Sequence, residues 1–326
     1  MSAPRPAPDL TLLELDAAAE TARLADAIRN AVTGTLKRRG AVLGLSGGID
    51  SSVTAALCVA ALGHKRVLGV LMPERDSDPD SLRLGRLVAD HLGIETVVED
   101  IGPSLDAAGC YARRDGFIRL AVPSYGPDWK CKIVLGDTAA GYAISYLVVE
   151  SPGGEQTRHR MSAEVYRGVI AAANMKQRTR KQLEYYHADR LGYAVAGTPN
   201  LLEYDQGFFV KNGDGAADFK PIAHLYKSQV YQLAAHLGLP AEICARPPTT
   251  DTWSLPQSQE EFYFSAPYKV MDVCMHGLEN GFSAETTAAK AGLSADEVAV
   301  IWRDIAAKRA ATSYLHEAPI LFARPR

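Results

Sequence analysis

An alternation of strands and helices dominates the first hundred residues of the chain. The sequence predicts strands at 41–45, 67–72 and 95–98, and helices at 49–62 and 81–92. Gly63 and Gly93 follow the two helices, at the position where a left-handed residue commonly ends a helix. Such alternation is typical of a parallel sheet with a crossover helix between successive strands. We therefore expect an α/β fold with a twisted parallel sheet and helices on both faces.

The rest of the chain is compatible with a single domain. The sequence predicts further helices at 11–39, 171–191, 227–237 and 272–278, and further strands at 132–135, 144–149 and 193–196. The segment from about 103 to 170 is less regular and rich in turn signals. We expect one domain over residues 1–326, with 103–170 as a possible insertion.

Composition excludes several classes of function. Lys+Arg 35 against Asp+Glu 38 gives a net charge of −3, whereas dedicated nucleic-acid binders usually carry a basic excess. The five cysteines are widely spaced and form no CxxC pair, which argues against a disulfide framework or a structural zinc site. The N-terminus lacks the apolar core of a signal peptide, and no apolar run approaches the ~20 residues that span a bilayer. We expect a cytoplasmic protein with no membrane or nucleic-acid partner.

A glycine- and serine-rich turn connects the strand at 41–45 to the following helix. It reads Ser46-Gly47-Gly48-Ile49-Asp50-Ser51. Unpaired N–H groups at a helix start can hold an anion, and glycine lets the backbone approach it closely. Asp50 would repel a phosphate unless a cation lies between them, and Mg²⁺, which prefers oxygen ligands, suits that place. The turn therefore predicts a site for a phosphate and a metal ion.

The same turn excludes two common nucleotide sites. It matches neither the GxxxxGK[ST] loop nor the GxGxxG turn. A Ser-Gly-Gly sequence alone would be an ordinary helix cap. With a strand before it and Asp50-Ser51 after it, the turn resembles the pyrophosphate-binding loop of the ATP pyrophosphatases. Those enzymes split ATP to AMP and pyrophosphate while they adenylate a substrate.

Three later segments narrow the resemblance. They are GTPNLLE at 197–203, FVKNGDGAAD at 209–218 and RPPTTD at 246–251. Each alone is an ordinary turn-forming loop. In this order after the SGGIDS turn, and with Lys227 between the last two, they resemble the ammonia-dependent NAD synthetases. The resemblance covers about residues 20–100 and 171–310 and implies a Rossmann-like fold of the adenine nucleotide α-hydrolase type.

The resemblance also implies roles for individual residues, with Asp50 and Lys227 as the catalytic pair. It assigns ATP to Gly44, Leu45, Ser46, Gly47, Gly48, Ile49, Asp50, Ser51, Thr198, Lys227 and Thr249. It assigns Mg²⁺ to Asp50 and Glu203. It assigns the deamido-NAD substrate to Arg178, Lys211, Asp218 and Lys308, and Ala307-Lys308 stands where the family carries a His-Lys pair.

The implied reaction suits these residue types. A carboxylate does not react with ammonia, because it is resonance-stabilised and has no good leaving group. Adenylation converts it into a mixed anhydride from which ammonia displaces AMP. Mg²⁺, Lys227 and the amides of the turn can stabilise the charge that develops on the phosphates. Arg178 carries a planar, permanently charged group that suits a substrate phosphate.

Two other functions remain open at this point. The first is the same ATP-dependent amidation of a different carboxylic acid, which the 103–170 segment and Ala307 motivate. The second is a nucleotide-binding regulatory protein that has lost turnover. The retention of Asp50, Glu203 and Lys227 argues against that second function.

The resemblance implies free ammonia as the amine donor and a homodimer with the acceptor site at its interface. Only a tail and one predicted helix precede the ATP loop, so we expect no glutaminase domain. The apolar residues Leu183, Tyr185 and Tyr186 in a basic helix favour a dimer surface.

The 103–170 segment is expected near the acceptor site. Tyr125, Trp129 and Arg158 could supply aromatic and cationic contacts to an extended substrate there, and the alternative is a surface hairpin with no role in binding.

Overall fold

The central sheet of the computed structural model is parallel, as predicted. The structure describes residues 6–136, 145–250, 252–264 and 266–322. Four strands lie in the order β3-β2-β1-β7, and each neighbouring pair is parallel. Their bounds are Ala41–Gly44 for β1, Val67–Leu71 for β2, Glu95–Val98 for β3 and Ala194–Val195 for β7. Parallel strands end at the same edge, so the turns after β1, β2 and β7 lie together.

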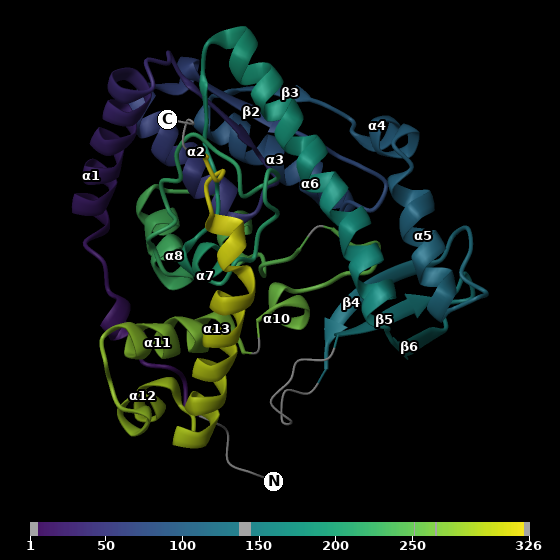
Figure 1. Ribbon diagram of the computed structural model, residues 1–326. Coiled ribbons are helices and arrows are strands. Elements are labelled where there is room, and N and C mark those ends of the chain that lie inside the picture. The colour runs from purple at the N-terminus through teal and green to yellow at the C-terminus, as the bar shows by residue number, and fades with distance from the viewer. Residues whose placement is uncertain (1–5, 137–144, 251, 265, 323–326) are drawn as a thin grey trace.

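Helices cover both faces of this sheet, which confirms the predicted fold class (Figure 1). One face packs on α1 (Ala17–Arg29), α2 (Ile49–Leu62), α3 (Pro79–Leu92), α8 (Lys227–His236) and α9 (Ala241–Ala245). The long helix α6 (Ala163–Leu191) packs on the other face against Val42, Leu68 and Val195.

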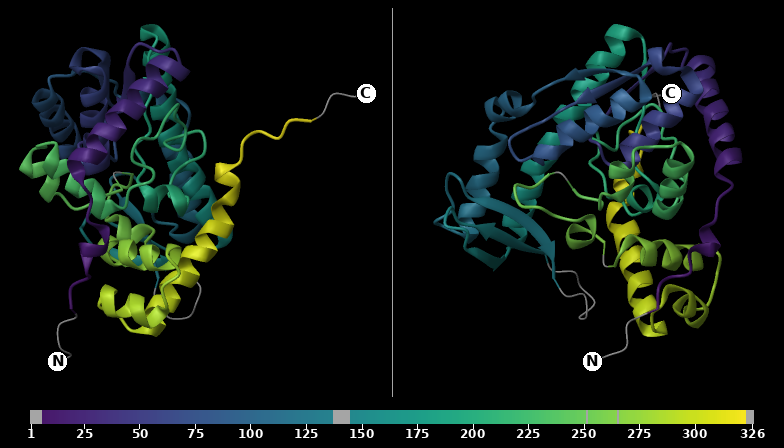
Figure 2. Two further views of the ribbon diagram at one scale, coloured as in Figure 1. Left: turned by 90° about the vertical axis from the view of Figure 1, so that its left-hand side faces the viewer. Right: turned by 180° about the vertical axis from the view of Figure 1, so that it is seen from behind.

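A second, antiparallel sheet lies to one side of the parallel one (Figures 1 and 2). It consists of β4 (Lys130–Leu135), β5 (Ser145–Glu150) and β6 (Gln156–Arg160) in that order. Its apolar side chains form one cluster with α5 (Cys110–Ala121) and the start of α6. The short helix α4 (Gly102–Ala107) precedes α5.

The C-terminal helices form a third cluster with the N-terminal turn at Leu10–Leu13. They are α11 (Tyr268–Glu279), α12 (Ala284–Ala291) and α13 (Ala295–His316). The short helices α7 (Leu201–Asp205) and α10 (Gln259–Phe262) lie between this cluster and the sheets (Figure 1).

The predicted single helix at 11–39 was wrong. A 3₁₀ turn at Leu10–Leu13, α1 and a π-helical turn at Asn30–Thr35 occupy this stretch. Asp16 starts α1 afresh, because its side chain accepts a hydrogen bond from the backbone N–H of Ala19 at 2.9 Å. Lys37 takes a left-handed φ of 53°, which ends the helical run before Arg39.

Other predictions differ mainly in their bounds. Helix α2 and strand β3 begin and end where predicted. The predicted strand at 144–149 corresponds to β5, although Ile144 lies outside the described residues. Helix α6 begins earlier than 171, because Ser162 caps it with a hydrogen bond from Val165 N–H at 3.2 Å. Strand β6 was not predicted, because its residues are polar and mostly exposed.

The cysteines behave as the sequence suggested. All five are free, with Cys58, Cys110, Cys131 and Cys274 buried and Cys244 half-buried. Burial raises the pKa of the Cys58 thiol to about 12, so it is protonated and unreactive at neutral pH.

Across the described ranges, no helix is both long and apolar enough to cross a membrane.

Candidate functional site

One large cavity opens at the carboxyl edge of the parallel sheet. It has a volume of about 840 Å³ and reaches from the start of α2 to helix α13. Twelve of the predicted site residues line it: Ser46, Gly48, Ile49, Asp50, Ser51, Arg178, Thr198, Glu203, Lys211, Lys227, Thr249 and Lys308. Gly44, Leu45 and Gly47 belong to the turn but do not line the cavity, nor does Asp218.

The turn after β1 has a conformation that only glycine suits. Gly47 has a φ of +74°, and a Cβ atom there would lie 2.4 Å from the Cβ of Leu84. Ser51 and Ser52 both donate hydrogen bonds to the carbonyl of Gly48, at 3.0 and 2.8 Å. These bonds fix the start of α2, whose first N–H groups can receive a phosphate.

Two carboxylates and one lysine meet at this end of the cavity. The Lys227 ammonium donates a short hydrogen bond to Asp50 and lies 4.0 Å from Glu203 Oε1. Burial alone would lower the pKa of Lys227, but the charges of Asp50 and Glu203 outweigh it and raise that pKa. Burial and the charge of Asp50 raise the pKa of Glu203 to about 7, although Lys227 opposes them. Lys227 thus stays protonated, and the two carboxylates lack a second positive charge.

Neighbouring elements hold these three groups in place. Glu203 lies in the first turn of α7, where its carboxylate accepts from the N–H of Asn200 at 3.2 Å and its own N–H donates to the Asn200 side chain at 3.2 Å. The Asn200 amide also donates to Asp50 at 3.1 Å. Lys227 opens α8, and its N–H donates to the buried carboxylate of Asp272 at 3.3 Å. The first turns of three helices, α2, α7 and α8, therefore deliver one polar cluster.

This cluster has the donor set of a divalent-cation site. When both carboxylates are ionised, one lysine leaves a net negative charge that a cation can balance, and carboxylate oxygens are the ligands that hard cations prefer. Among the described residues, no group of three or more acidic, His or Cys side chains gathers into a complete cage. Asp50 and Glu203 would then hold the ion together with oxygens from a bound ligand.

The opposite end of the cavity is basic. Arg178 on α6 donates to the carbonyl of Lys211 at 3.2 Å. The Lys211 ammonium donates to the carbonyls of Tyr314 and Glu317, at 2.6 and 2.9 Å, and so caps the end of α13. Lys308 pairs with Asp304 at 2.6 Å.

Asp218 lies outside this group. Its carboxylate accepts a hydrogen bond from the N–H of Val195 at 2.7 Å and a long one of 3.4 Å from Tyr185. It therefore fixes the end of β7. Asp251, the last residue of the RPPTTD segment, lies outside the described residues.

The residues expected to cap the acceptor site lie elsewhere. Tyr125 is buried in the cluster beneath the antiparallel sheet, Trp129 packs beside it, and Arg158 stacks on Tyr146 at 4.0 Å. Leu135 and Ser145 are the members of this sheet that line the cavity. The aromatic contacts predicted from the sequence were wrong, because these side chains build the core of their own sheet.

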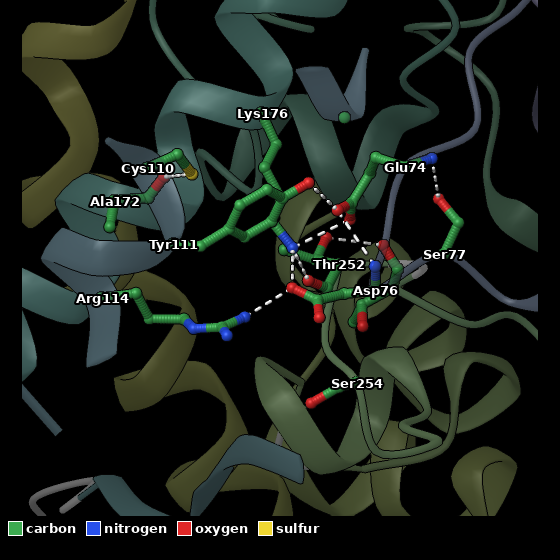
Figure 3. A network of polar contacts seen from close by, with 12 residues as sticks. Glu74, Asp76, Ser77, Cys110, Tyr111, Arg114, Ala172, Lys176, Thr252 and Ser254 are labelled. Carbon is green, nitrogen blue, oxygen red and sulfur yellow. Dashed lines mark hydrogen bonds and ion pairs between the residues drawn. The ribbon is translucent and has the colours of Figure 1, made fainter. Parts of the chain in front are cut away.

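Helix α6 carries a run of basic residues, Lys176, Arg178, Arg180 and Lys181, of which Lys176 and Lys181 are buried. Lys176, in its middle, is buried and donates to Glu74 at 2.9 Å, to Asp76 at 2.6 Å and to the carbonyl of Thr252 at 2.8 Å (Figure 3). Arg114 on α5 pairs with the same Asp76 at 2.5 Å. These contacts join α5, α6, the loop after β2 and the loop that carries Thr249.

Sequence reasoning missed three residues that contact the cluster: Asn200, Asp272 and Gln259. Asn200 stood inside the GTPNLLE segment, where a helix cap was recognisable in principle. Gln259 donates to Glu203 at 2.8 Å from a separate loop. Nothing in the surrounding Gln-Glu-Glu run signals that contact.

The fold and the site together define a class of protein. A parallel sheet whose first strand leads through Ser-Gly-Gly into a helix, with Asp50, Glu203 and Lys227 converging at its carboxyl edge, is that of a nucleotide-binding enzyme of the ATP-pyrophosphatase type. The family model described as NAD synthase matches residues 20–116 and 153–311. The chain belongs to this family.

Individual relatives agree with the family. The NH(3)-dependent NAD(+) synthetase of Rhizobium meliloti is 64% identical over 311 residues, which are 95% of this chain and 93% of that protein. The structure of an NMN synthetase from Francisella tularensis has a TM-score of 0.66 at 20% identity, over 94% of this chain and 99% of that one. An NH3-dependent NAD synthetase from Campylobacter jejuni has a TM-score of 0.62 at 22% identity, over 95% and 100%. These two structures support the fold.

Proposed function

We propose that this protein is an ammonia-dependent NAD synthetase. It adenylates the carboxylate of deamido-NAD with ATP, and ammonia then displaces AMP to give NAD. The family, the relative at 64% identity and the site chemistry support this function. The single observation that carries it is one cavity with a carboxylate–lysine cluster at one end and Arg178 and Lys211 at the other. An ATP and an extended dinucleotide acid can meet in such a cavity.

The nucleotide end has groups suited to adenylation. Mg²⁺, held by Asp50 and Glu203, would supply charge stabilisation to the phosphates of ATP. Lys227 keeps its proton, so its ammonium can stabilise the charge that develops as the α-phosphate is attacked. Thr198 and Thr249 also line the cavity and offer hydroxyl groups. The positive end of the α2 dipole, at its first N–H groups, favours the binding of the ATP phosphates.

The acceptor end binds and orients the acid. Arg178 can hold a substrate phosphate with a planar pair of donors, and Lys211 adds a second positive charge. Lys308 lines the same region, with a pKa that burial lowers and Asp304 opposes. A different carboxylic acid stays the alternative, because Ala307 replaces the histidine of the family pair.

The first test supplies the purified protein with ATP, Mg²⁺ and either deamido-NAD or a panel of other carboxylic acids. We expect ATP–pyrophosphate exchange and NAD formation with deamido-NAD, and at least roughly tenfold lower exchange with the other acids, since their phosphate contacts are missing. Ammonium should support product formation and an equal concentration of glutamine, freed of ammonia, should not. Faster exchange with another acid would identify that acid as the substrate.

A homodimer and a cytoplasmic location stay predictions. The structure weakens one argument for the dimer, because Leu183 and Tyr185 pack inside the molecule and only Tyr186, 58% exposed, faces outward. We still expect a dimer, as the resemblance implies. Light scattering of an active preparation at working concentration should give twice the mass of the 35.1 kDa chain, and a monomeric mass would contradict the expectation.

A further inference from the structure

A hairpin-like loop carries residues of the nucleotide end. It runs from Pro248 to Gln259, closed by a bridge between Thr249 and Ser258 and by the N–H of Gln259, which donates to Pro248 O at 3.3 Å. Thr249 lines the cavity at the neck of this loop. Gln259, at the other side of the neck, donates to the carboxylate of Glu203 at 2.8 Å. The position of the neck therefore determines where the side chains of Thr249 and Gln259 lie in the site.

The backbone of strand β4 forms hydrogen bonds with residues 254–257 of this loop. The N–H of Cys131 donates to Ser254 Oγ at 2.8 Å, and the N–H of Leu255 donates to Cys131 O at 3.2 Å. The Gln257 amide donates a short hydrogen bond to Ile133 O. These three contacts, one of them between two backbones, attach this segment to β4, the edge strand of the antiparallel sheet.

Side chains add further contacts that hold the loop. Lys132 on β4 donates to Pro256 O at 3.2 Å and pairs with Glu261 at 2.7 Å. Trp253, at 5% exposure, is buried in the apolar cluster beneath the sheet. From the other side, Lys176 holds the carbonyl of Thr252 at 2.8 Å. Residues 252–257 of the loop are thus held by their neighbours, whereas Asp251 lies outside the described residues.

Strand β4 lies within residues 117–152, which the NAD synthase family model leaves unmatched. We propose that β4 is a positioning element for ATP and its divalent cation, acting through the loop from Pro248 to Gln259 on Thr249 and Gln259. The unmatched segment then acts on the nucleotide end of the cavity, whereas the sequence suggested the acceptor end. This inference rests on the proposed function for the identity of the substrates.

The test weakens the contacts between β4 and the loop without changing a residue that lines the cavity. Lys132→Ala combined with Ser254→Ala deletes the ion pair and leaves the N–H of Cys131 without its acceptor. The KM for ATP should rise roughly tenfold, as expected for the loss of about two hydrogen bonds, while the KM for deamido-NAD should change less than about twofold. The Mg²⁺ concentration for half-maximal activity should rise with the KM for ATP. Lys132→Arg, which keeps the charge and the donors, should restore most of the affinity when tested against Lys132→Ala.

Lys130→Ala is the matched control. Lys130 lies on the same strand but pairs with Glu150 within the sheet at 3.6 Å, and its side chain is 55% exposed. This variant should keep both KM values. An equal rise of both KM values in the double variant, or no rise in either, would overturn the proposal.

Equilibrium binding of Mg²⁺-ATP, measured without any acceptor, separates this inference from the proposed function. The double variant should bind Mg²⁺-ATP more weakly than the unmodified protein, whichever acid the enzyme amidates. Unchanged nucleotide binding in a protein that makes NAD would refute the role of β4 alone. Failure of the unmodified protein to make NAD, with weaker binding in the variant, would refute the proposed acceptor alone.

Discussion

Asp50→Ala is expected to lower the rate of NAD formation by roughly a thousandfold, because it removes a proposed metal ligand and the partner of Lys227 together. The Asp50 carboxylate is 16% exposed and contacts both Lys227 and the Asn200 amide. Lys227, whose side chain is 2% exposed, would retain only Glu203 at 4.0 Å. That remaining carboxylate can still balance the lysine, so the fold should survive. Initial rates at saturating ATP and deamido-NAD measure the loss, and far-UV circular dichroism checks the fold.

Three further variants test whether the charge of Asp50, rather than its shape, is required. Asp50→Asn keeps the volume but removes the charge, and it should lose nearly as much activity as Asp50→Ala. Glu203→Gln should behave alike, because both carboxylates are proposed to meet one ion. Asp80→Ala is the matched control, since Asp80 also lies in the first turn of a helix but pairs with Arg83 at the surface. Near-normal turnover of Asp50→Ala over a Mg²⁺ titration would refute the metal assignment.

The elements that carry the nucleotide end were predictable because their signals are local. The run at 41–45, the Ser46-Gly47-Gly48 turn and the helix at 49–62 each follow from propensities within a few residues. Parallel strand order then brings the turns after β1 and β7 to one edge without further information. For this reason Asp50 and Thr198 could be expected at one site from the sequence alone.

Contacts made over long sequence separations were not predictable in this way. Gln259 lies 56 residues from Glu203, and Lys132 lies 129 residues from Glu261. Each pair depends on how a loop packs on another element, and a polar run carries no periodicity that reports it. A run of basic residues such as Lys176, Arg178, Arg180 and Lys181 by itself predicts a solvent-exposed helix face, for the same reason. The partners of Lys176 come from a loop about a hundred residues away in the sequence and supply charges that a single helix cannot reveal.

The buried position of Lys176 leads to the largest expected effect on stability. The Lys176 side chain is 2% exposed, Glu74 is fully buried, and Asp76 is 5% exposed. Two carboxylates face two cations there, because Arg114 pairs with Asp76 from α5 and the hydroxyl of Tyr111 donates to Glu74 at 2.9 Å. Burial would raise the pKa of Asp76, but Lys176 and Arg114 outweigh burial and keep that pKa below its usual 3.8.

Lys176→Met fills the space of the lysine stem, but the carboxylates of Glu74 and Asp76 then carry negative charge that Arg114 alone does not balance. We expect the free energy of unfolding to fall by about 3–5 kcal/mol at pH 7, the usual cost of removing one partner from a buried ion pair. Urea titration monitored by circular dichroism measures the change. Lys290→Met is the control: its partner Asp9 is 3.4 Å away and both side chains are about one-third exposed, so the loss should stay below ~1 kcal/mol.

Lowering the pH should narrow the difference between Lys176→Met and the unmodified protein. A carboxyl whose pKa is depressed in the folded state contributes stability that is present above its unfolded pKa and lost as the pH falls through the folded value. In the unmodified protein, Asp76 therefore loses its contribution only below pH 3.8. In the variant, the lysine no longer holds that pKa down, so the Asp76 carboxyl takes up a proton at a higher pH and the uncompensated charge disappears. The gap in unfolding free energy should be largest near pH 7 and shrink toward pH 4, and a gap that is constant over this range would mean that Lys176 acts by packing alone.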